Sequence, residues 1–133
     1  MNSFYLNKIL IYKFPNLKDI YIEETKWQEG DNTGSHIVYG NVFAPYLRYC
    51  IENNNINELN KISNFLETLL DINNQYVNEV VAFSVLENIL DLLQLNNNLV
   101  LQLHIHKRIY LFLIDTHSLK FDSTTATHQP LLA

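Results

Sequence analysis

Cysteine, glycine, proline and charged residues are all scarce in this sequence. Cys50 is the single cysteine, so no disulfide can form within the chain and nothing indicates an oxidising compartment. Its place on an apolar helical face predicts a small buried side chain. Only three glycines and three prolines occur among 133 residues, which favours helices joined by short links over a turn-rich fold.

A long hydrophobic run is also lacking. The most apolar stretch, residues 99–114, is interrupted by polar and charged residues and falls short of the ~20 apolar residues of a membrane span. Lys8 and Lys13 interrupt the N-terminal apolar stretch, so no signal peptide is recognised and we expect a cytoplasmic protein. The length suits one domain, which we place at residues 1–122, followed by a flexible tail at 123–133.

Asparagine takes the place of the missing turn residues. Runs of three asparagines at residues 53–55 and 96–98 mark breaks between helices, and residues 29–35 form the clearest loop. We expect two helices within residues 3–27, split near Pro15, with a short strand at 20–22 as an alternative. Further helices are expected at about residues 41–53, with Pro45 in the first turn, and at about 56–72 and 75–93. This pattern predicts an all-α fold, a compact bundle of stacked antiparallel helical hairpins that loosely resembles a helical repeat.

Residues 99–117 allow two interpretations. Apolar and polar residues alternate there, which suits a strand, but Lys107 breaks the alternation and the run exceeds ordinary strand length. We therefore expect a helix.

The fourth helix has the clearest amphipathic pattern. Its apolar residues cluster in one arc, Asn55 is expected to cap its start, and Glu58 partly imitates a capping box. Its polar residues recur at i, i+4, i+7 and i+11 and form one ridge: Asn60, Asn64, Glu67 and Asp71. The fifth helix, capped by Asn73 or Asn74, is apolar over most of its circumference and should be central. Its narrow polar stripe holds Ser84, Glu87, Asn88 and Asp91.

Negative charge is concentrated in the middle of the chain. The net charge is −5, and residues 50–95 hold seven acids against one base, Lys61. Such a field repels nucleic acid and attracts a basic partner. The alternative is that these acids are only the solvated faces of helices.

Signals for catalysis or metal binding are weak. His104 and His106 would share a side only on a strand, and two histidines leave a zinc site short of ligands. Cys50 could in principle form a nucleophilic dyad with a histidine, but an apolar position disfavours its thiolate. The aromatic residues Trp27, Tyr39, Tyr46 and Tyr49 flank the loop and could serve an interface, although core packing explains aromatics equally well.

Three short segments carry a family resemblance: Tyr39-Gly40, Phe65-Leu66-Glu67 and Val85-Leu86-Glu87. Over residues 35–92 the chain resembles small bacterial helical proteins that serve as immunity proteins of toxin systems, including contact-dependent growth inhibition. The resemblance implies a cytoplasmic antitoxin that binds and blocks a toxin domain, often a nuclease.

We therefore expect a non-enzymatic immunity protein, without cofactor or metal, that binds a basic nuclease toxin domain. It should bind neither nucleic acid nor membrane. The expected contact residues are Asn60, Asn64, Glu67, Asp71, Glu87, Asn88 and Asp91. The alternative is a helical-repeat adaptor or scaffold in an endogenous complex.

Overall fold

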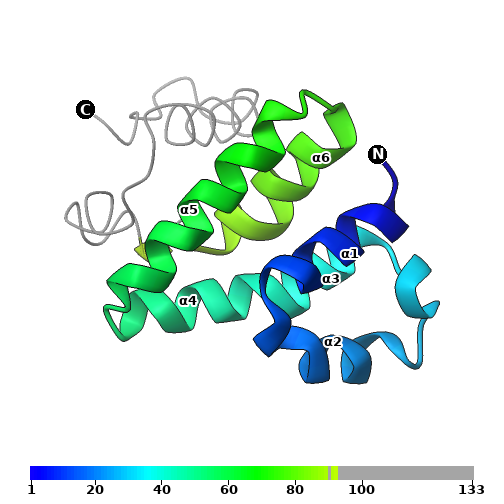
Figure 1. Cartoon of the computed structure of the whole chain (residues 1–133), viewed down its shortest axis with the longest axis horizontal. Helices are drawn as coiled ribbons and strands as arrows, with labels where there is room; N and C mark the ends of the chain where they lie inside the picture. The colour runs from blue at the N-terminus through cyan, green and yellow to red at the C-terminus, as the bar shows by residue number, and fades with distance from the viewer. Residues whose placement is uncertain (90, 93–133) are drawn as a thin grey trace.

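Every secondary-structure element in the part of the chain that the computed structural model describes, residues 1–89 and 91–92, is helical. The helices stack as antiparallel hairpins, which confirms the predicted all-α bundle (Figure 1). In chain order the elements are α1 (Ser3–Lys13), η1 (Pro15–Leu17), α2 (Lys18–Thr25), η2 (Gly30–Asn32), α3 (Ser35–Val38), η3 (Tyr39–Phe43), α4 (Ala44–Glu52), α5 (Ile56–Asp71), α6 (Gln75–Glu79), η4 (Val80–Val85) and η5 (Leu86–Ile89).

Several predictions concern residues outside the described part. They are the choice between helix and strand at residues 99–117, the domain end at 122, the tail at 123–133, and the histidine pair at 104 and 106. None of the described helices combines the length and the apolar content that a bilayer crossing needs.

The N-terminal hairpin is confirmed. Asn2 caps α1, because its side-chain oxygen accepts the backbone N–H of Tyr5 at 3.1 Å. Phe14 leaves the helical conformation before Pro15, and the short η1 leads directly into α2. The strand alternative at residues 20–22 is wrong, since those residues lie within α2.

The third helix begins earlier than the sequence predicts. Pro45 does lie in the first turn of α4, but residues 35–43 before it are already helical. The segment η3 is a π-helix, and the N–H of Ala44 reaches back five residues to the carbonyl of Tyr39. A wider turn accommodates a proline inside a longer helical run, because proline cannot donate the ordinary bond. The expected start at residue 41 is therefore wrong.

The C-terminal hairpin of the described part follows the predicted breaks. Asn54 and Asn73 adopt left-handed conformations, with φ of 52° and 57°, and each is followed by a capping asparagine. Asn55 accepts the N–H of Glu58 at 3.3 Å, and Asn74 accepts that of Val77 at 3.1 Å. The full capping box is not made, because the Asn55 N–H donates to the Cys50 carbonyl instead. The fifth helix is not uniformly α, since π-helical η4 and 3₁₀-helical η5 continue α6.

A cluster of three phenylalanines joins the hairpins. The ring centroids of Phe14 and Phe43, of Phe14 and Phe65, and of Phe43 and Phe65 lie 5.3, 5.3 and 5.7 Å apart. They come from the end of α1, from η3 and from α5, so one cluster links three parts of the chain.

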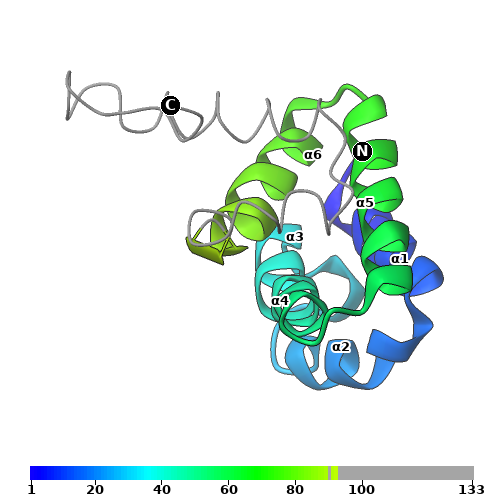
Figure 2. The same cartoon turned by 90° about the vertical axis from the view of Figure 1, so that its left-hand side faces the viewer.

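The run of α3 and α4 lies between α2 and α6 (Figure 2). Cys50 on α4 is fully buried, as predicted.

Candidate partner-binding surface

The outer face of α5 carries four of the seven predicted contact residues. The opposite face is buried, with Leu59, Ile62 and Leu69 each 1% exposed. Asn64 and Asp71 are exposed, and Asn60 and Glu67 are half-buried. This set, Asn60, Asn64, Glu67 and Asp71, is called the α5 ridge below. Its members share one side of the helix because the α-helical spacing of the sequence is kept throughout Ile56–Asp71.

The other three predicted residues come from a different element. Glu87 and Asn88 lie in η5, and Asp91 follows it. The Asn88 side chain donates to the Ser84 carbonyl at 2.6 Å, which is a contact within its own helical run. The seven residues are therefore two groups, one on α5 and one on η5 with the residues after it.

Asp91 is engaged by an arginine of the same chain. The Arg48 guanidinium donates from Nη2 to Oδ2 at 2.9 Å and from Nη1 to Oδ1 at 3.2 Å. Nη1 also reaches the Asn88 carbonyl at 3.1 Å. These bonds hold the pKa of Asp91 below its ordinary value. Arg48 thus pairs with Asp91 within the chain, and the role of Asp91 in partner binding stays a prediction.

A second acid of the middle segment is also engaged internally. Tyr46 donates its hydroxyl to the Glu58 carboxylate, across the hairpin of α4 and α5. Burial, together with this bond, raises the pKa of Tyr46. Cys50 lies beside this pair, and burial raises the pKa of its thiol as well, so the thiolate that a nucleophile needs is disfavoured.

The loop before α3 is fixed by a buried polar network that the sequence did not reveal. Asn7 is fully buried on α1, and its amide donates to the carbonyls of Thr33 at 2.7 Å and Asp31 at 3.2 Å. Its carbonyl oxygen accepts the Ser35 hydroxyl at 2.8 Å. The Tyr76 hydroxyl also belongs to this network, because it accepts the Ser35 backbone N–H at 3.2 Å. The network accounts for the helix start at Ser35.

A histidine–serine pair lies where the two π-helical segments pack together. His36 Nδ1 is 2.7 Å from the Ser84 hydroxyl, and the Tyr76 ring meets the imidazole edge-on at 5.5 Å. Such a pair has the spacing of a base and a nucleophile, and π segments are frequent at functional sites. Ser84 is only 7% exposed, however, so its hydroxyl is screened from a substrate. The bond ties α3 to η4.

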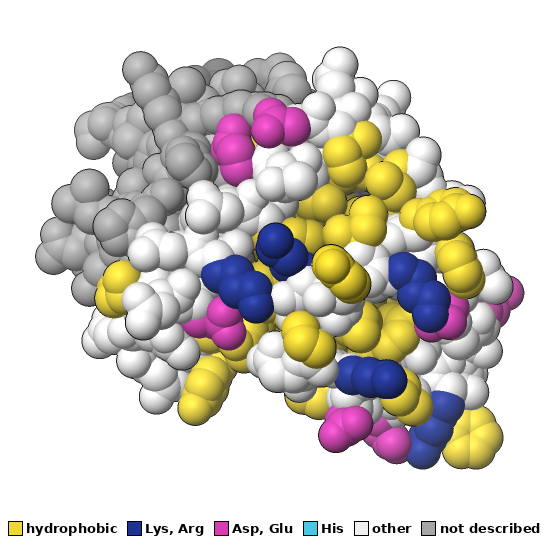
Figure 3. Space-filling model, in the orientation of Figure 1, with side chains coloured by type: hydrophobic (Ala, Val, Ile, Leu, Met, Phe, Trp, Pro, Cys, Tyr) yellow, Lys and Arg dark blue, Asp and Glu magenta, His cyan; other side chains and the backbone are white. Residues whose placement is uncertain are grey.

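The exposed aromatic residues differ in part from those expected. Trp27 is 84% and Tyr49 58% exposed, whereas Tyr39 is fully buried. Tyr5 and Tyr12 on α1, which no sequence pattern singled out, are 59% and 88% exposed. Apolar, basic and acidic side chains are mixed over α1 and α2, and further acidic side chains lie over α5 (Figure 3).

Metal ligands are not assembled in residues 1–89 and 91–92, where no three histidine, cysteine, aspartate or glutamate side chains are grouped to hold an ion.

Comparison with known proteins identifies a family for this chain. No curated protein and no solved structure is similar to the chain. A family model described as a domain of unknown function (DUF7674) matches residues 7–108. This range begins within α1 and takes in every later described element, including the α5 ridge. Since the match covers most of the sequence, the chain belongs to this family of domains of unknown function.

Proposed function

We propose that this chain is an immunity protein that binds and blocks a basic toxin domain, and that the α5 ridge forms the centre of the contact. The observation that carries the proposal is the ridge itself. Two amides and two carboxylates lie on one side of a regular helix whose other side is buried. One carboxylate oxygen of Glu67 is buried, whereas Asn64 and Asp71 are exposed, so the ridge offers a partner both charge and hydrogen-bonding groups.

The placement of Asp71 supports a role in binding. Asp71 is the last residue of α5, where the partial negative charge of the helix end disfavours a carboxylate. Glu67 lies one turn before it, so the two like charges also repel each other. Local choices that oppose helix stability are typical of functional sites.

Electrostatics favours a nuclease as the target. Nuclease toxins hold phosphates and are therefore usually basic, so an acidic ridge supplies a complementary field. Steered association of this kind reaches about 10⁸ M⁻¹s⁻¹ or more. The resemblance to immunity proteins points the same way and implies action in the cytoplasm of the producing cell.

The first experiment is co-purification of the chain with the product of the neighbouring gene. A stable complex with a toxin domain is expected. If no complex forms and the neighbouring gene encodes no toxin domain, the proposal is contradicted and an adaptor is favoured.

The exposed indole of Trp27 supports the adaptor alternative, because an exposed tryptophan can anchor another kind of protein.

The second experiment reverses charge on the ridge. We expect Glu67→Lys combined with Asp71→Lys to weaken toxin binding at least tenfold by calorimetry, because two attractive contacts become repulsive. The chain offers a matched control in Asp19→Lys with Glu23→Lys, which has the same spacing and charge change on α2. Equal losses in both variants, or none in either, would refute the ridge as the site. Circular dichroism checks that helix content is unchanged.

A further inference from the structure

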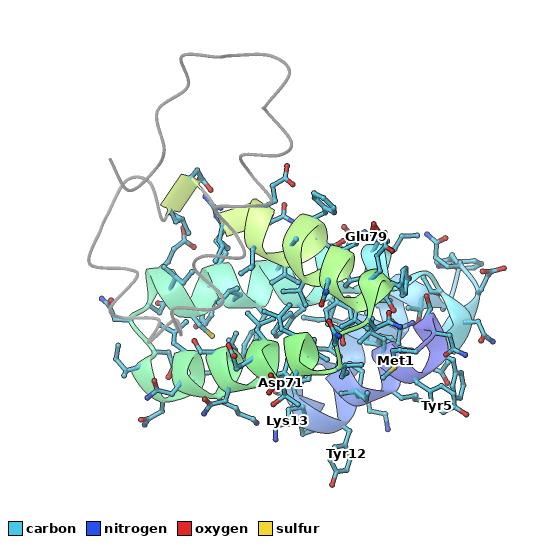
Figure 4. The ribbon with its side chains drawn as sticks, turned by 90° about the horizontal axis from the view of Figure 1, so that it is seen from above. Met1, Tyr5, Tyr12, Lys13, Asp71 and Glu79 are labelled. Atoms are coloured by element: carbon cyan, nitrogen blue, oxygen red, sulfur yellow. The ribbon has the colours of Figure 1, made fainter. Side chains whose placement is uncertain are left out.

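The outer face of α1 is aromatic and basic. Tyr5 and Tyr12 are seven residues apart, two helical turns, so they lie almost in line. Tyr12 projects away from the bundle, and Lys13 follows it at the end of the helix (Figure 4). Lys8 lies between the tyrosines in sequence, and its amine stands 5.8 Å from the Phe4 ring centroid. Tyr5, Lys8, Tyr12 and Lys13 are called the α1 face below.

Charge on the two helices is opposite in sign. Residues 1–18 hold three lysines and no acid, whereas α5 holds Glu58, Glu67 and Asp71 against one base, Lys61. Lys8 is bound to Asp31 at 3.0 Å, yet its side chain remains 52% exposed. Lys13 and Asp71 are the last residues of their helices, and both are exposed.

We propose that the α1 face of one copy docks on the α5 ridge of a second copy. Contact between two α1 faces would bring lysines together, and contact between two α5 ridges would bring carboxylates together. Only the crossed arrangement places opposite charges against each other and also covers Tyr5 and Tyr12. Two such contacts related by a twofold axis close a dimer, the commonest oligomer symmetry.

Self-association also has a consequence for regulation, which rests on the proposed function. The second copy would occupy the same ridge as the toxin, so toxin and self-association compete. The chain alone suffices to test the contact, which separates its failure from failure of the toxin hypothesis.

The experiment is sedimentation velocity of the full chain over a range of concentrations, at low salt and at about 0.5 M salt. We expect an average mass that rises towards the dimer with concentration at low salt and falls in high salt. Tyr12→Ala should raise the dissociation constant about tenfold or more, as truncation of a central interface tyrosine does. Tyr49→Ala on α4, which removes another exposed tyrosine, is the control and should leave it unchanged.

Complementary variants test the crossed geometry. An α1 variant, Tyr12→Ala with Lys13→Glu, and a ridge variant, Glu67→Lys with Asp71→Lys, should each be monomeric alone. Mixed in equal amounts they should form a one-to-one complex, because the mixture retains one intact α1 face and one intact ridge. A wild-type chain that stays monomeric at low salt overturns the proposal. So does a ridge variant that still dimerises by itself, which would indicate contact between two α1 faces.

Discussion

A single buried amide, that of Asn7, connects α1 to the loop before α3. Three of its hydrogen bonds join groups 24 to 28 residues away, and its side chain is fully shielded from water. A buried polar group is stabilising only while its partners remain bonded. The loop that the sequence identified is thus ordered by a residue that the sequence did not single out.

Replacing this amide should be costly. We expect Asn7→Ala to lower the free energy of unfolding by about 2–4 kcal/mol, because two carbonyls lose a donor and the Ser35 hydroxyl loses one of its acceptors around a fully buried side chain. Urea denaturation measures the change. Asn57→Ala, at an exposed position on α5, is the control and should stay within about 0.5 kcal/mol of wild type. Similar values for both would contradict the structural role of the network.

Tyr21 and Asp31 make stability depend on pH. The Tyr21 hydroxyl donates to Asp31 at 2.6 Å and, with Lys8, holds the pKa of Asp31 below its ordinary value of about 4. A folded-state pKa that is lowered contributes stability above about pH 4, and this contribution is lost as pH falls through the folded value. We expect the stability difference between wild type and Tyr21→Phe to shrink as pH is lowered from about 5 to about 2.

The control for that titration is Tyr39→Phe. The Tyr39 hydroxyl donates to the Leu6 carbonyl at 2.7 Å, and a backbone carbonyl does not titrate. Its stability loss should therefore be constant over the same pH range in urea denaturation. A loss that changes with pH equally in both variants would show that Asp31 is not responsible.

At the scale of the helix, local signals predicted most of the structure. The sequence predicted the ends of α5 and its cap at Asn55, and it limited the cap of the next helix to Asn73 or Asn74, of which Asn74 is the cap. These predictions succeeded because capping chemistry acts within four residues. The sequence also predicted the α5 ridge, because the ridge depends only on helical spacing. It did not predict the π-helical segments or the early start of α3, because these depend on packing against residues far along the chain.

The asparagine run between α4 and α5 should respond differently at adjacent positions. Asn55→Ala removes the helix cap and should cost about 1 kcal/mol in urea denaturation. Asn54 has positive φ, a conformation that glycine adopts at no steric cost, so Asn54→Gly should be close to neutral. The opposite order of effects would show that the cap bond contributes little.

At the scale of the whole molecule, residues that are distant in sequence form ion pairs that offset part of the negative charge. Arg48 and Asp91 are 43 residues apart in the sequence. Their pairing depends on how α4 packs on η5, which no local pattern encodes. The sequence therefore predicted the sign of the middle segment and the placement of the α5 ridge on one helix face, but not the pairing of Asp91 with Arg48.

Removal of Arg48 should strengthen the field that the proposed toxin meets. We expect Arg48→Gln to raise the association rate with the basic toxin a few-fold at low salt, because Asp91 loses its neutralising partner. Lys26→Gln removes another ion-paired base, the partner of Glu23 at 2.7 Å on α2, and should have a smaller effect. Stopped-flow kinetics at two salt concentrations gives both rates. Equal increases would mean that net charge, rather than its position, governs capture.

The π-helical segment η4 holds more residues per turn than the α-helix that precedes it. One residue fewer in Val80–Val85 would therefore let the wide turn close to α-helical geometry, and the residues beyond it would keep nearly the same direction. We expect such a deletion to leave Leu86 and Ile89 in the core and Asp91 within reach of Arg48. The same deletion within α5 would instead turn everything beyond it by about 100° around the helix axis. A single-codon deletion should thus be tolerated in η4 and disruptive in α5.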